Sequence, residues 1–560
     1  MTIESNGPAA DCLKHIHRRA SLRHRTLPKA IALALGVGIP WQANGQEFPA
    51  SVDLALLNGT DGFRVEGNFV VGGLGYSLEN AGDVNGDGLD DLIIGSYSAS
   101  PPGEAYAGIT YVVFGQDEFP PSFSVDDLSP DPSDLFGQEP GFRIFGVETL
   151  DRSGRAVSGA GDVNGDGLDD LIIGASFAAV SGNFEAGSSF VVFGRDQAAG
   201  DTFPPLALPL SGLDGSTGFR VNGVAENNRS GEAVSAIGDV NGDGLADVII
   251  GAAGARSSYV VFGRNTGFGS ALALSSLDGN SGFRIDGASL NGFGRSVNEA
   301  GDIDGDGIDD LVIGAPFADA STGRVVVIFG QQSGFPALVP VANLGIGDGF
   351  EILGQAPGDR LGASVSNAGD LNSDGINDLV IGAYLADPDG NSGAGRVYVL
   401  FGRNDGFGES VDLSTLDGGN GFRVDGAGTN SYLGRSVSMV DDVNGDGRDD
   451  LLMGAHGTSS RAGAAFLLFG RAQGQPFPPA FNVSSLSSVG GVRFDGVSNY
   501  DDAGFAVSSA GDINGDGLAD IAIGARGVTP GSVSNAGTAY VVFGRSERVF
   551  RDRFQADELP

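Results

Sequence analysis

Hydrophobic residues lie along this chain in short runs separated by stretches rich in glycine and aspartate. The runs are β-branched and aromatic, as in YVVFG at 111–115, FVVFG at 190–194 and GFRVEG at 62–67. Short runs of this kind, bounded by turn residues, are typical of β-strands, and no segment shows sustained helical periodicity. The pattern therefore predicts an all-β protein.

One acidic segment recurs seven times together with the runs around it. It reads GDVNGDGLDDLIIG at 82–95, and the other copies lie at 161–174, 238–251, 301–314, 369–382, 441–454 and 511–524. Successive copies are 63 to 79 residues apart, a period that indicates one supersecondary unit per copy. Each unit contains four strand-like runs: one before the acidic segment, one after it, the YVVFG run and the GFRVEG run. The repeat predicts a seven-bladed β-propeller with four-stranded blades, and an open β-solenoid is the alternative.

The order of runs at the two ends predicts how the ring closes. GFRVEG at 62–67 precedes the first acidic segment, whereas the seventh unit ends soon after YVVFG at 540–544. We therefore expect residues 48–67 to complete the last blade, which would remove an open sheet edge. The expected propeller covers 48–546, with blades at 68–146, 147–223, 224–287, 288–354, 355–426, 427–496 and 497–546 plus 48–67.

The spacing D-x-[ND]-x-D-G-x-x-D in the acidic segment predicts a metal site. It offers side-chain oxygens at positions 1, 3, 5 and 9 and a backbone carbonyl at position 7. Hard oxygen ligands on a flexible loop suit Ca²⁺, and glycine at position 6 allows a sharp turn. Asp, Asn and Gly also form ordinary turns, but seven copies that keep positions 1, 5, 6 and 9 favour metal. We expect up to seven Ca²⁺ ions.

The expected ligands are Asp83, Asn85, Asp87, Leu89 and Asp91; Asp162, Asn164, Asp166, Leu168 and Asp170; Asp239, Asn241, Asp243, Leu245 and Asp247; Asp302, Asp304, Asp306, Ile308 and Asp310; Asp370, Asn372, Asp374, Ile376 and Asp378; Asp442, Asn444, Asp446, Arg448 and Asp450; and Asp512, Asn514, Asp516, Leu518 and Asp520. The fifth site has Ser373 in place of glycine, and the sixth has Arg448 at position 7. We expect these two sites to bind calcium more weakly than the others.

The succession of GxxV, GDVNGDGxxDLxIGA and YVVFG resembles the FG-GAP repeat of integrin α heads and their bacterial relatives. The resemblance covers about 48–546, nearly all of the chain after its N-terminal segment. It implies that the calcium loop joins strands one and two on one face of the disc. It also implies that partners meet the opposite face, which is built by the loops joining strand four to strand one (4–1) and strand two to strand three (2–3). The sequence shows no integrin leg domains, inserted adhesion domain or transmembrane anchor, so integrin-type signalling is not expected.

Charge is strongly unbalanced, with 71 acidic residues against 32 lysines and arginines and a net charge of −39. Both lysines, Lys14 and Lys29, lie in the first 29 residues. Nucleic-acid binding needs clustered cations, so this composition disfavours it. A surplus of carboxylates that holds metal ions agrees with the acidic loops.

The N-terminal 45 residues have the layout of a secretory signal. A basic region precedes the apolar run AIALALGVGI at 30–39 and then small polar residues, with cleavage expected near Ala43 or Gly45. The apolar run is too short to span a bilayer, and no other run approaches that length. We therefore expect a secreted or cell-surface protein, and a monomer. The alternative interpretation of residues 1–45 is a disordered cytosolic leader. The only cysteine, Cys12, would leave with the signal, and the tail at 547–560 is either a sorting tag or a frayed end.

Recognisable catalytic chemistry is scarce. After removal of the signal His456 is the only histidine, no lysine or cysteine remains, and no G-x-S-x-G motif occurs. We interpret His456 as an ordinary loop histidine. We expect a non-enzymatic module that binds an extracellular protein or glycan. The alternatives are a hydrolase acting on polysaccharide or phosphoester and a purely structural envelope protein.

Aromatic residues in the 4–1 and 2–3 loops are the candidate partner contacts. Exposed aromatics favour protein and sugar contacts, although the same residues could pack between blades. They are Tyr97, Tyr106, Phe177, Phe184, Phe317, Tyr384, Tyr432 and Tyr500.

Overall fold

The computed structural model describes residues 48–128, 140–197, 200, 203, 207–367 and 369–546. The expected signal at 1–45 and the tail at 547–560 therefore lie outside the described residues. None of the helices in the described part is long and apolar enough to cross a membrane.

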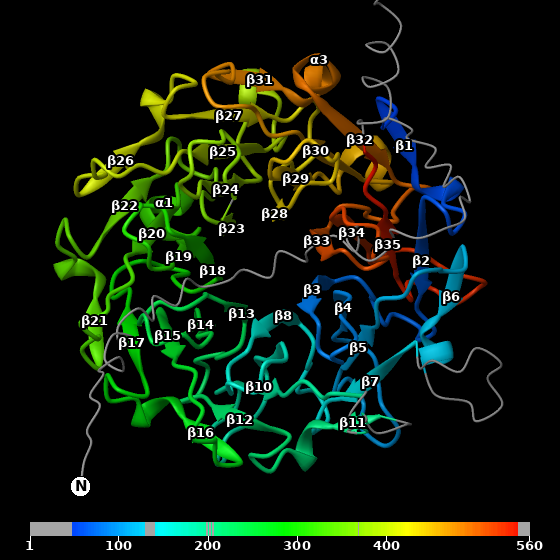
Figure 1. The fold of residues 1–560 in the computed structure, drawn as a ribbon, viewed down its shortest axis with the longest axis vertical. Helices are drawn as coiled ribbons and strands as arrows, with labels where there is room; N and C mark the ends of the chain where they lie inside the picture. Colours follow the sequence, from blue (N-terminus) through cyan, green and yellow to red (C-terminus); the bar gives the residue numbers. More distant parts are fainter. Residues whose placement is uncertain are drawn as a thin grey trace, which may run out of the picture. The chain divides into compact units, whose positions relative to one another are not determined.

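The described chain forms seven five-stranded sheets, which Figure 1 shows as blades around a common centre. In blade order, the innermost strands are β3 (Ser77–Gly82), β8 (Ala156–Gly161), β13 (Ala233–Ala236), β18 (Ser296–Gly301), β23 (Ser364–Asn367), β28 (Val437–Val440) and β33 (Ala506–Gly511). The second strands are β4 (Asp91–Ser96), β9 (Asp170–Ala175), β14 (Val248–Ala252), β19 (Asp310–Ala315), β24 (Leu379–Ala383), β29 (Asp450–Gly454) and β34 (Asp520–Ala525). The prediction of a seven-bladed β-propeller is confirmed.

The outer strands follow the same order. The third strands are β5 (Ile109–Val113), β10 (Ser188–Val192), β15 (Ser257–Val261), β20 (Arg324–Ile328), β25 (Arg396–Leu400), β30 (Ala464–Leu468) and β35 (Thr538–Val542). The fourth are β7 (Gly141–Phe145), β12 (Gly218–Asn222), β17 (Gly282–Asp286), β22 (Gly349–Leu353), β27 (Gly421–Asp425), β32 (Gly491–Asp495) and β2 (Gly62–Glu66). Consecutive strands from the first to the fourth pair antiparallel, as in β3–β4, β4–β5 and β5–β7.

A short fifth strand makes the blades wider than the four strands predicted. These strands are β11 (Leu208–Pro209), β16 (Ala271–Ala273), β21 (Leu338–Pro340), β26 (Ser410–Asp412), β31 (Ala480–Asn482), β1 (Ser51–Asp53) and β6 (Ser122–Ser124). Each pairs parallel with the fourth strand of the preceding blade, as β16 does with β12. The chain thus covers the outer edge of one blade on its way to the fourth strand of the next, which leaves less backbone unpaired at the rim.

The N-terminal described segment is divided between two sheets. β2 pairs antiparallel with β35 of the seventh blade, with Gly62 opposite Val542. β1 instead pairs parallel with β32 of the sixth blade, with Ser51 opposite Arg493. The prediction that all of 48–67 belongs to the seventh blade is therefore wrong for Ser51–Asp53, because this segment acts as the fifth strand of the blade before.

Helical segments are short and lie in the connections. Three α-helical turns are α1 (Ala318–Ser321), α2 (Thr458–Arg461) and α3 (Leu486–Val489). The 3₁₀ turns are η2 (Leu54–Leu56), η3 (Val125–Leu128), η4 (Leu210–Gly212), η5 (Leu274–Ser276), η6 (Val341–Asn343), η7 (Pro388–Gly390), η8 (Leu413–Thr415) and η9 (Val483–Ser485). Most 3₁₀ turns follow the fifth strands and lead the chain back toward a fourth strand.

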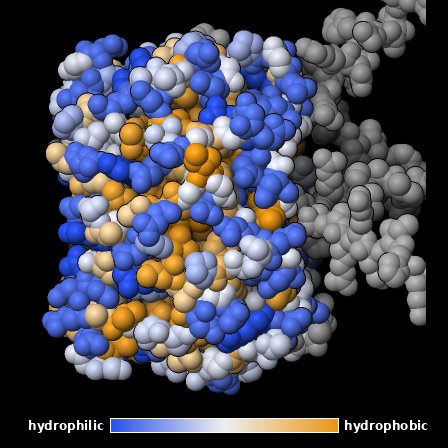
Figure 2. Space-filling model, turned by 90° about the vertical axis from the view of Figure 1, so that its left-hand side faces the viewer, coloured by the Kyte–Doolittle hydropathy of each residue, from blue (hydrophilic) through white to orange (hydrophobic). Residues whose placement is uncertain are grey.

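The hydrophobic core is divided into seven clusters, each between two neighbouring blades. The cluster between blades seven and one contains Leu92 and Ile94 of β4 together with Ala522 of β34 and Val541 of β35. Second and third strands are buried on both faces, which explains their continuous apolar runs. At the rim that holds β21, Figure 2 shows hydrophobic atoms in patches between hydrophilic ones, and Leu338 of β21 is among the exposed hydrophobic residues.

Candidate calcium loops and the channel mouth

The seven acidic segments form the loops between the first and second strands of the blades. In the first loop the Asp83 carboxylate accepts backbone N–H bonds from Gly86 (2.7 Å), Asp87 (3.1 Å) and Gly88 (2.9 Å). The bond from the position-6 glycine to the position-1 aspartate recurs in all seven loops at 2.6–2.9 Å. The loop backbone therefore orients the position-1 carboxylate in the same way in every blade.

The position-9 aspartates are the most deeply buried acidic groups of these loops. All seven are 0% exposed: Asp91, Asp170, Asp247, Asp310, Asp378, Asp450 and Asp520. In each, one carboxylate oxygen accepts an N–H bond of 2.8–3.0 Å from the glycine that ends the YVVFG-type run. A Cβ at the first of these glycines, Gly115, would lie 2.6 Å from the Asp90 carbonyl oxygen, so the position requires glycine.

Burial raises the pKa of the position-9 carboxylates. The pKa of Asp247 and of Asp310 rises to about 8. Burial is the largest cause of this rise, the neighbouring aspartates of each loop add to it, and backbone hydrogen bonds oppose it. The pKa of Asp91 is likewise raised well above its usual range by burial, with Asp87 and Asp83 as its acidic neighbours. A divalent cation bound in the loop would offset this cost, because it favours the ionised carboxylate.

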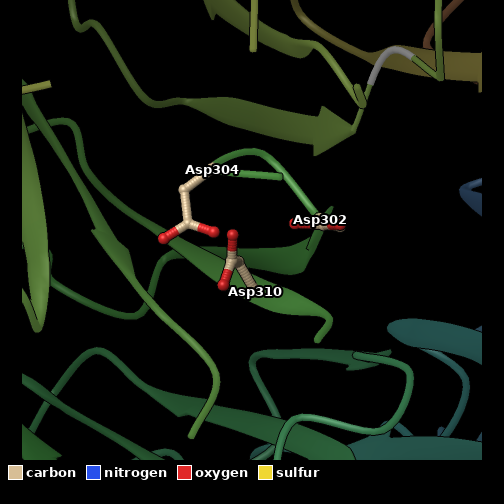
Figure 3. A group of neighbouring side chains, drawn as sticks. All are labelled: Asp302, Asp304 and Asp310. Carbon is tan, nitrogen blue, oxygen red and sulfur yellow. The ribbon is translucent and has the colours of Figure 1, made fainter. Parts of the chain in front are cut away.

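The fourth loop brings three carboxylates together. Asp302, Asp304 and Asp310 each offer an oxygen atom within 4.8 Å of the others, and Figure 3 shows Asp304 and Asp310 facing one another. In the other loops asparagine stands at position 3, and its amide also lies beside the carboxylates, as Asn85 Nδ2 does at 3.0 Å from Asp87 Oδ2. Carboxylate and amide oxygens from one short loop are the donor set that Ca²⁺ prefers, so the residues fit this ion.

The fifth and sixth loops differ from the others at the expected residues. Ser373 adopts the left-handed conformation with φ of 58°, and its hydroxyl donates to the Arg471 carbonyl oxygen at 2.9 Å. In the sixth loop the Arg448 guanidinium forms an ion pair of 2.7 Å with Asp446, the expected position-5 ligand. A protein cation therefore already occupies part of the oxygen set in the sixth loop.

Replacing Arg448 with leucine, the residue at position 7 of four other loops, is expected to strengthen calcium binding at the sixth site. The variant frees Asp446, and a partly exposed ion pair is worth roughly 0.2–1 kcal/mol, which corresponds to a gain of up to about fivefold. Calorimetric titration of both proteins with calcium measures the difference. Arg256→Leu removes the same charge from a 2–3 loop on the other face, and equal titrations for Arg448→Leu and Arg256→Leu would contradict the prediction.

A set of aspartates that the sequence interpretation left unassigned links neighbouring loops. The position-8 residue Asp90 accepts the backbone N–H of Asp512 at 2.7 Å, so blade one holds the loop of blade seven. Asp169, Asp309 and Asp449 make the same bond, each at 2.9 Å, to Asp83, Asp239 and Asp370. Position 8 is aspartate in these four loops only, so the repeat pattern gave a weaker signal there than at the metal positions.

Backbone hydrogen bonds join every loop to the next blade. The residue after the YVVFG-type glycine donates its N–H to the carbonyl of position 2 in the preceding blade, as Gln116 does to Ile513 at 2.9 Å. The other pairs are Arg195–Val84, Arg264–Val163, Gln331–Val240, Arg403–Ile303, Arg471–Leu371 and Arg545–Val443. Order in one acidic loop is therefore coupled to the strands of its neighbour.

The opposite ends of the inner strands surround the mouth of a central channel. A cavity of about 300 Å³ lies there, lined by the first residues of the inner strands and by residues of the 2–3 loops. Of the eight loop aromatics predicted as partner contacts, Phe317 and Tyr384 line this cavity, and Tyr97, Phe177 and Tyr432 are half-buried. Tyr106, Phe184 and Tyr500 are exposed.

His456 lies in the 2–3 loop between β29 and β30, which agrees with its interpretation as a loop histidine, and it is buried there. It is 8% exposed and stacks on Tyr432 with ring centroids 5.2 Å apart. Burial, followed by the nearby Arg435 guanidinium, lowers the pKa of His456 to about 3, so it is neutral at physiological pH. Sequence reasoning missed this packing because it depends on Phe505 of the next blade, whose ring lies edge-on at 5.3 Å.

Glu79 of β3 lines the same cavity. Burial raises its pKa to about 8, a hydrogen bond from Ser158 opposes the shift, and Glu299 adds to it. The carboxyl group is therefore largely protonated at neutral pH.

Glu79→Gln is expected to stabilise the protein as the pH rises. Because the folded-state pKa lies above the unfolded-state value, the unfolded chain ionises Glu79 while the folded chain keeps it protonated. The wild type therefore loses stability progressively between about pH 4.5 and 8, at about 1.4 kcal/mol per pH unit. The difference in melting temperature between Glu79→Gln and the wild type should be near zero at pH 4.5 and should grow up to pH 8. The exposed Glu226→Gln is the control, and a pH-independent difference for Glu79→Gln would refute the argument.

Comparison with known families matches seven segments of the chain to the FG-GAP repeat. The segments are 74–113, 153–192, 230–273, 294–328, 361–400, 433–468 and 503–542. Each begins just before the first strand of a blade; six end with its third strand, and 230–273 continues to the end of β16. The chain is an FG-GAP repeat protein. The matched repeat thus contains the acidic loop with its position-9 aspartate, and in six of the seven blades it ends two residues before the YVVFG-type glycine that donates to that aspartate.

Curated relatives of this FG-GAP protein include integrin α chains. Integrin alpha-PS2 of Drosophila melanogaster is 31% identical over 231 residues, which cover 40% of this chain and 14% of the relative. Integrin alpha pat-2 of Caenorhabditis elegans is 30% identical over 239 residues, covering 40% and 17%. The phosphatidylinositol-glycan-specific phospholipase D of Bos taurus is 31% identical over 205 residues, covering 36% and 22%. The FG-GAP protein therefore aligns with less than a quarter of the length of these relatives, and its β-propeller is of the integrin α N-terminal type.

Proposed function

We propose that this protein is an exported calcium-binding β-propeller that acts as an adhesion or ligand-binding module. In this proposal Ca²⁺ ions order the acidic loops on one face, and the 4–1 and 2–3 loops on the other face contact an extracellular protein or glycan. The ligands of each ion are the position 1, 3, 5 and 9 side chains and the position-7 carbonyl, up to seven ions in all.

The observation that carries the proposal is the set of seven fully buried position-9 aspartates. Each lies in a loop with at least two further carboxylates, and its acidic neighbours disfavour the charged form. Retaining three or four carboxylates in every loop would be costly unless a cation binds there. Calcium supplies charge neutralisation and fixes the loop backbone, and the position-8 aspartates and the backbone bonds between blades carry that order around the ring.

A binding role is supported over an enzymatic one. The similarity to integrin α chains concerns the propeller, and the one histidine of residues 46–560 is buried against Tyr432. The face opposite the calcium loops differs between blades, whereas the strands and the acidic loops repeat. A variable face on a repeated scaffold is typical of recognition surfaces.

The test uses purified residues 46–560. Elemental analysis after dialysis against low calcium should find several calcium ions per chain. On protein and glycan arrays, the purified protein should bind specific spots. Absence of bound metal together with no calcium heat in calorimetry would overturn the calcium part. Turnover on a panel of polysaccharides and phosphoesters would replace the binding role with the hydrolase alternative.

A further inference from the structure

Arginines gather at the channel mouth of a chain whose net charge is −39. Arg155, Arg295, Arg360 and Arg435 all line the 300 Å³ cavity, and only Glu79 and Glu232 among its lining residues are acidic. Three of these arginines occupy the same place in their blades, directly after the glycine that precedes the inner strand. The ring geometry therefore concentrates cations that lie far apart in the sequence.

Aromatic rings hold these guanidinium groups in place. Arg435 lies over Phe505, with 4.7 Å to the ring centroid, and also over Tyr384 at 5.8 Å. Arg360 lies over Phe317 at 5.2 Å and donates to the Tyr384 hydroxyl. Stacking of this kind fixes the plane of a guanidinium group and restricts its motion before any ligand arrives.

Carboxylates of the protein satisfy only part of this positive charge. Glu232 pairs with Arg295 and lies 3.8 Å from Arg155. Within the described part of the chain, neither Arg360 nor Arg435 forms an ion pair, and Arg435 makes no side-chain hydrogen bond. Its donors are thus available to an acceptor in the cavity.

The surroundings of Arg435 disfavour its charge. Burial in the channel wall lowers its pKa, and the nearby cations Arg295 and Arg526 lower it further. Glu79 does not compensate, because its own raised pKa of about 8 keeps it largely protonated at neutral pH. An anion placed among these arginines would relieve this repulsion and gain charge-assisted hydrogen bonds.

We propose that the channel mouth binds the carboxylate of an aspartate or glutamate side chain presented by a loop of a protein partner, with Arg360 and Arg435 as its principal donors. This inference rests on the proposed binding function of the same face. The planar guanidinium fork matches a carboxylate in two parallel hydrogen bonds, and the aromatic rings surround the aliphatic part of the incoming side chain.

The observations favour a protein loop over an acidic polysaccharide. The cavity of about 300 Å³ is ample for an acidic side chain, so charge rather than volume decides between the two occupants. A polyanion would meet the repulsion of a chain with net charge −39, whereas a loop with one acidic residue would meet much less. A single carboxylate is enough to offset the mutual repulsion of the unpaired arginines.

The test is ligand-observed NMR on residues 46–560 with N-acetyl-aspartate N-methylamide as the probe. Saturable binding is expected, and Arg435→Gln and Arg360→Gln should each weaken it by about tenfold or more, as loss of a hydrogen bond to a charged group implies. The matched control is Arg264→Gln, which removes an arginine stacked on Phe268 at 4.2 Å beside the calcium loops. Arg264→Gln should bind the probe as the wild type does.

Further arms separate the possible outcomes. The asparagine analogue should not compete with the probe, and equal binding of both analogues, or no saturable binding of either, overturns the proposal. Tighter binding of methyl glucuronide than of the aspartate probe would also overturn it in favour of an acidic glycan. Calcium content and melting temperature are measured on each variant, so a failure of the calcium proposal is seen separately from a failure at the channel mouth.

Discussion

Removal of calcium with EGTA is expected to lower the melting temperature of residues 46–560 by about 10–20 °C. Each site that binds only the folded protein adds about 2.7 kcal/mol when free calcium is 100 times its Kd, and the chain has seven such loops. The large unfolding entropy of a domain of this size reduces the shift per kcal/mol, which gives the range stated. Differential scanning calorimetry in EGTA and in millimolar calcium measures it.

Two controls separate metal binding from charge screening. Sodium chloride at matched ionic strength should restore only a small part of the loss, since screening weakens repulsion between exposed carboxylates but does not reach the buried position-9 groups. Adding calcium back should restore the full melting temperature. Identical melting curves in EGTA and calcium would show that the loops are held by their hydrogen bonds alone.

The blade repeat was predictable because its signals are local. The acidic loop, the YVVFG-type run and the GFRVEG run each occur within a few residues, so seven copies reveal the strands and their order. The fifth strands were missed because each has two or three residues and takes its conformation from the edge of the preceding blade. The prediction wrongly placed Ser51–Asp53 on blade seven instead of blade six for the same reason, since pairing with Arg493 depends on a strand far away in the sequence.

The site was predictable to different degrees on the two faces. The candidate metal positions follow from spacing within one loop, whereas the Asp90 bond to Asp512 joins residues 422 positions apart. On the channel face, aligning the repeats shows Arg155, Arg295 and Arg435 at one position, which was a usable signal. The proximity of these arginines, however, depends on closure of the ring of blades. That their charge is only partly neutralised becomes clear from the structure, in which Glu232 pairs with Arg295 and lies near Arg155.

Phe63→Ala is expected to destabilise the protein by about 3–5 kcal/mol at saturating calcium. Phe63 of β2 is 0% exposed and stacks on Phe119 of blade one, with ring centroids 4.0 Å apart and planes at 10°. The substitution leaves a cavity between blades seven and one and removes a stacked aromatic pair. Urea unfolding followed by circular dichroism measures the change in midpoint and in free energy.

The equivalent phenylalanine of another blade is the control that makes this prediction specific to the N-terminal strand. Phe219 of β12 is also 0% exposed and stacks on Phe268 at 4.1 Å, but its strand lies within the continuous chain of its blade. If β2 holds blade seven as the structure indicates, Phe63→Ala and Phe219→Ala should cost similar free energies, while the exposed Leu56→Ala should cost little. A neutral Phe63→Ala beside a costly Phe219→Ala would mean that the seventh blade is stable without its N-terminal strand, because only the packing of β2 distinguishes the two variants.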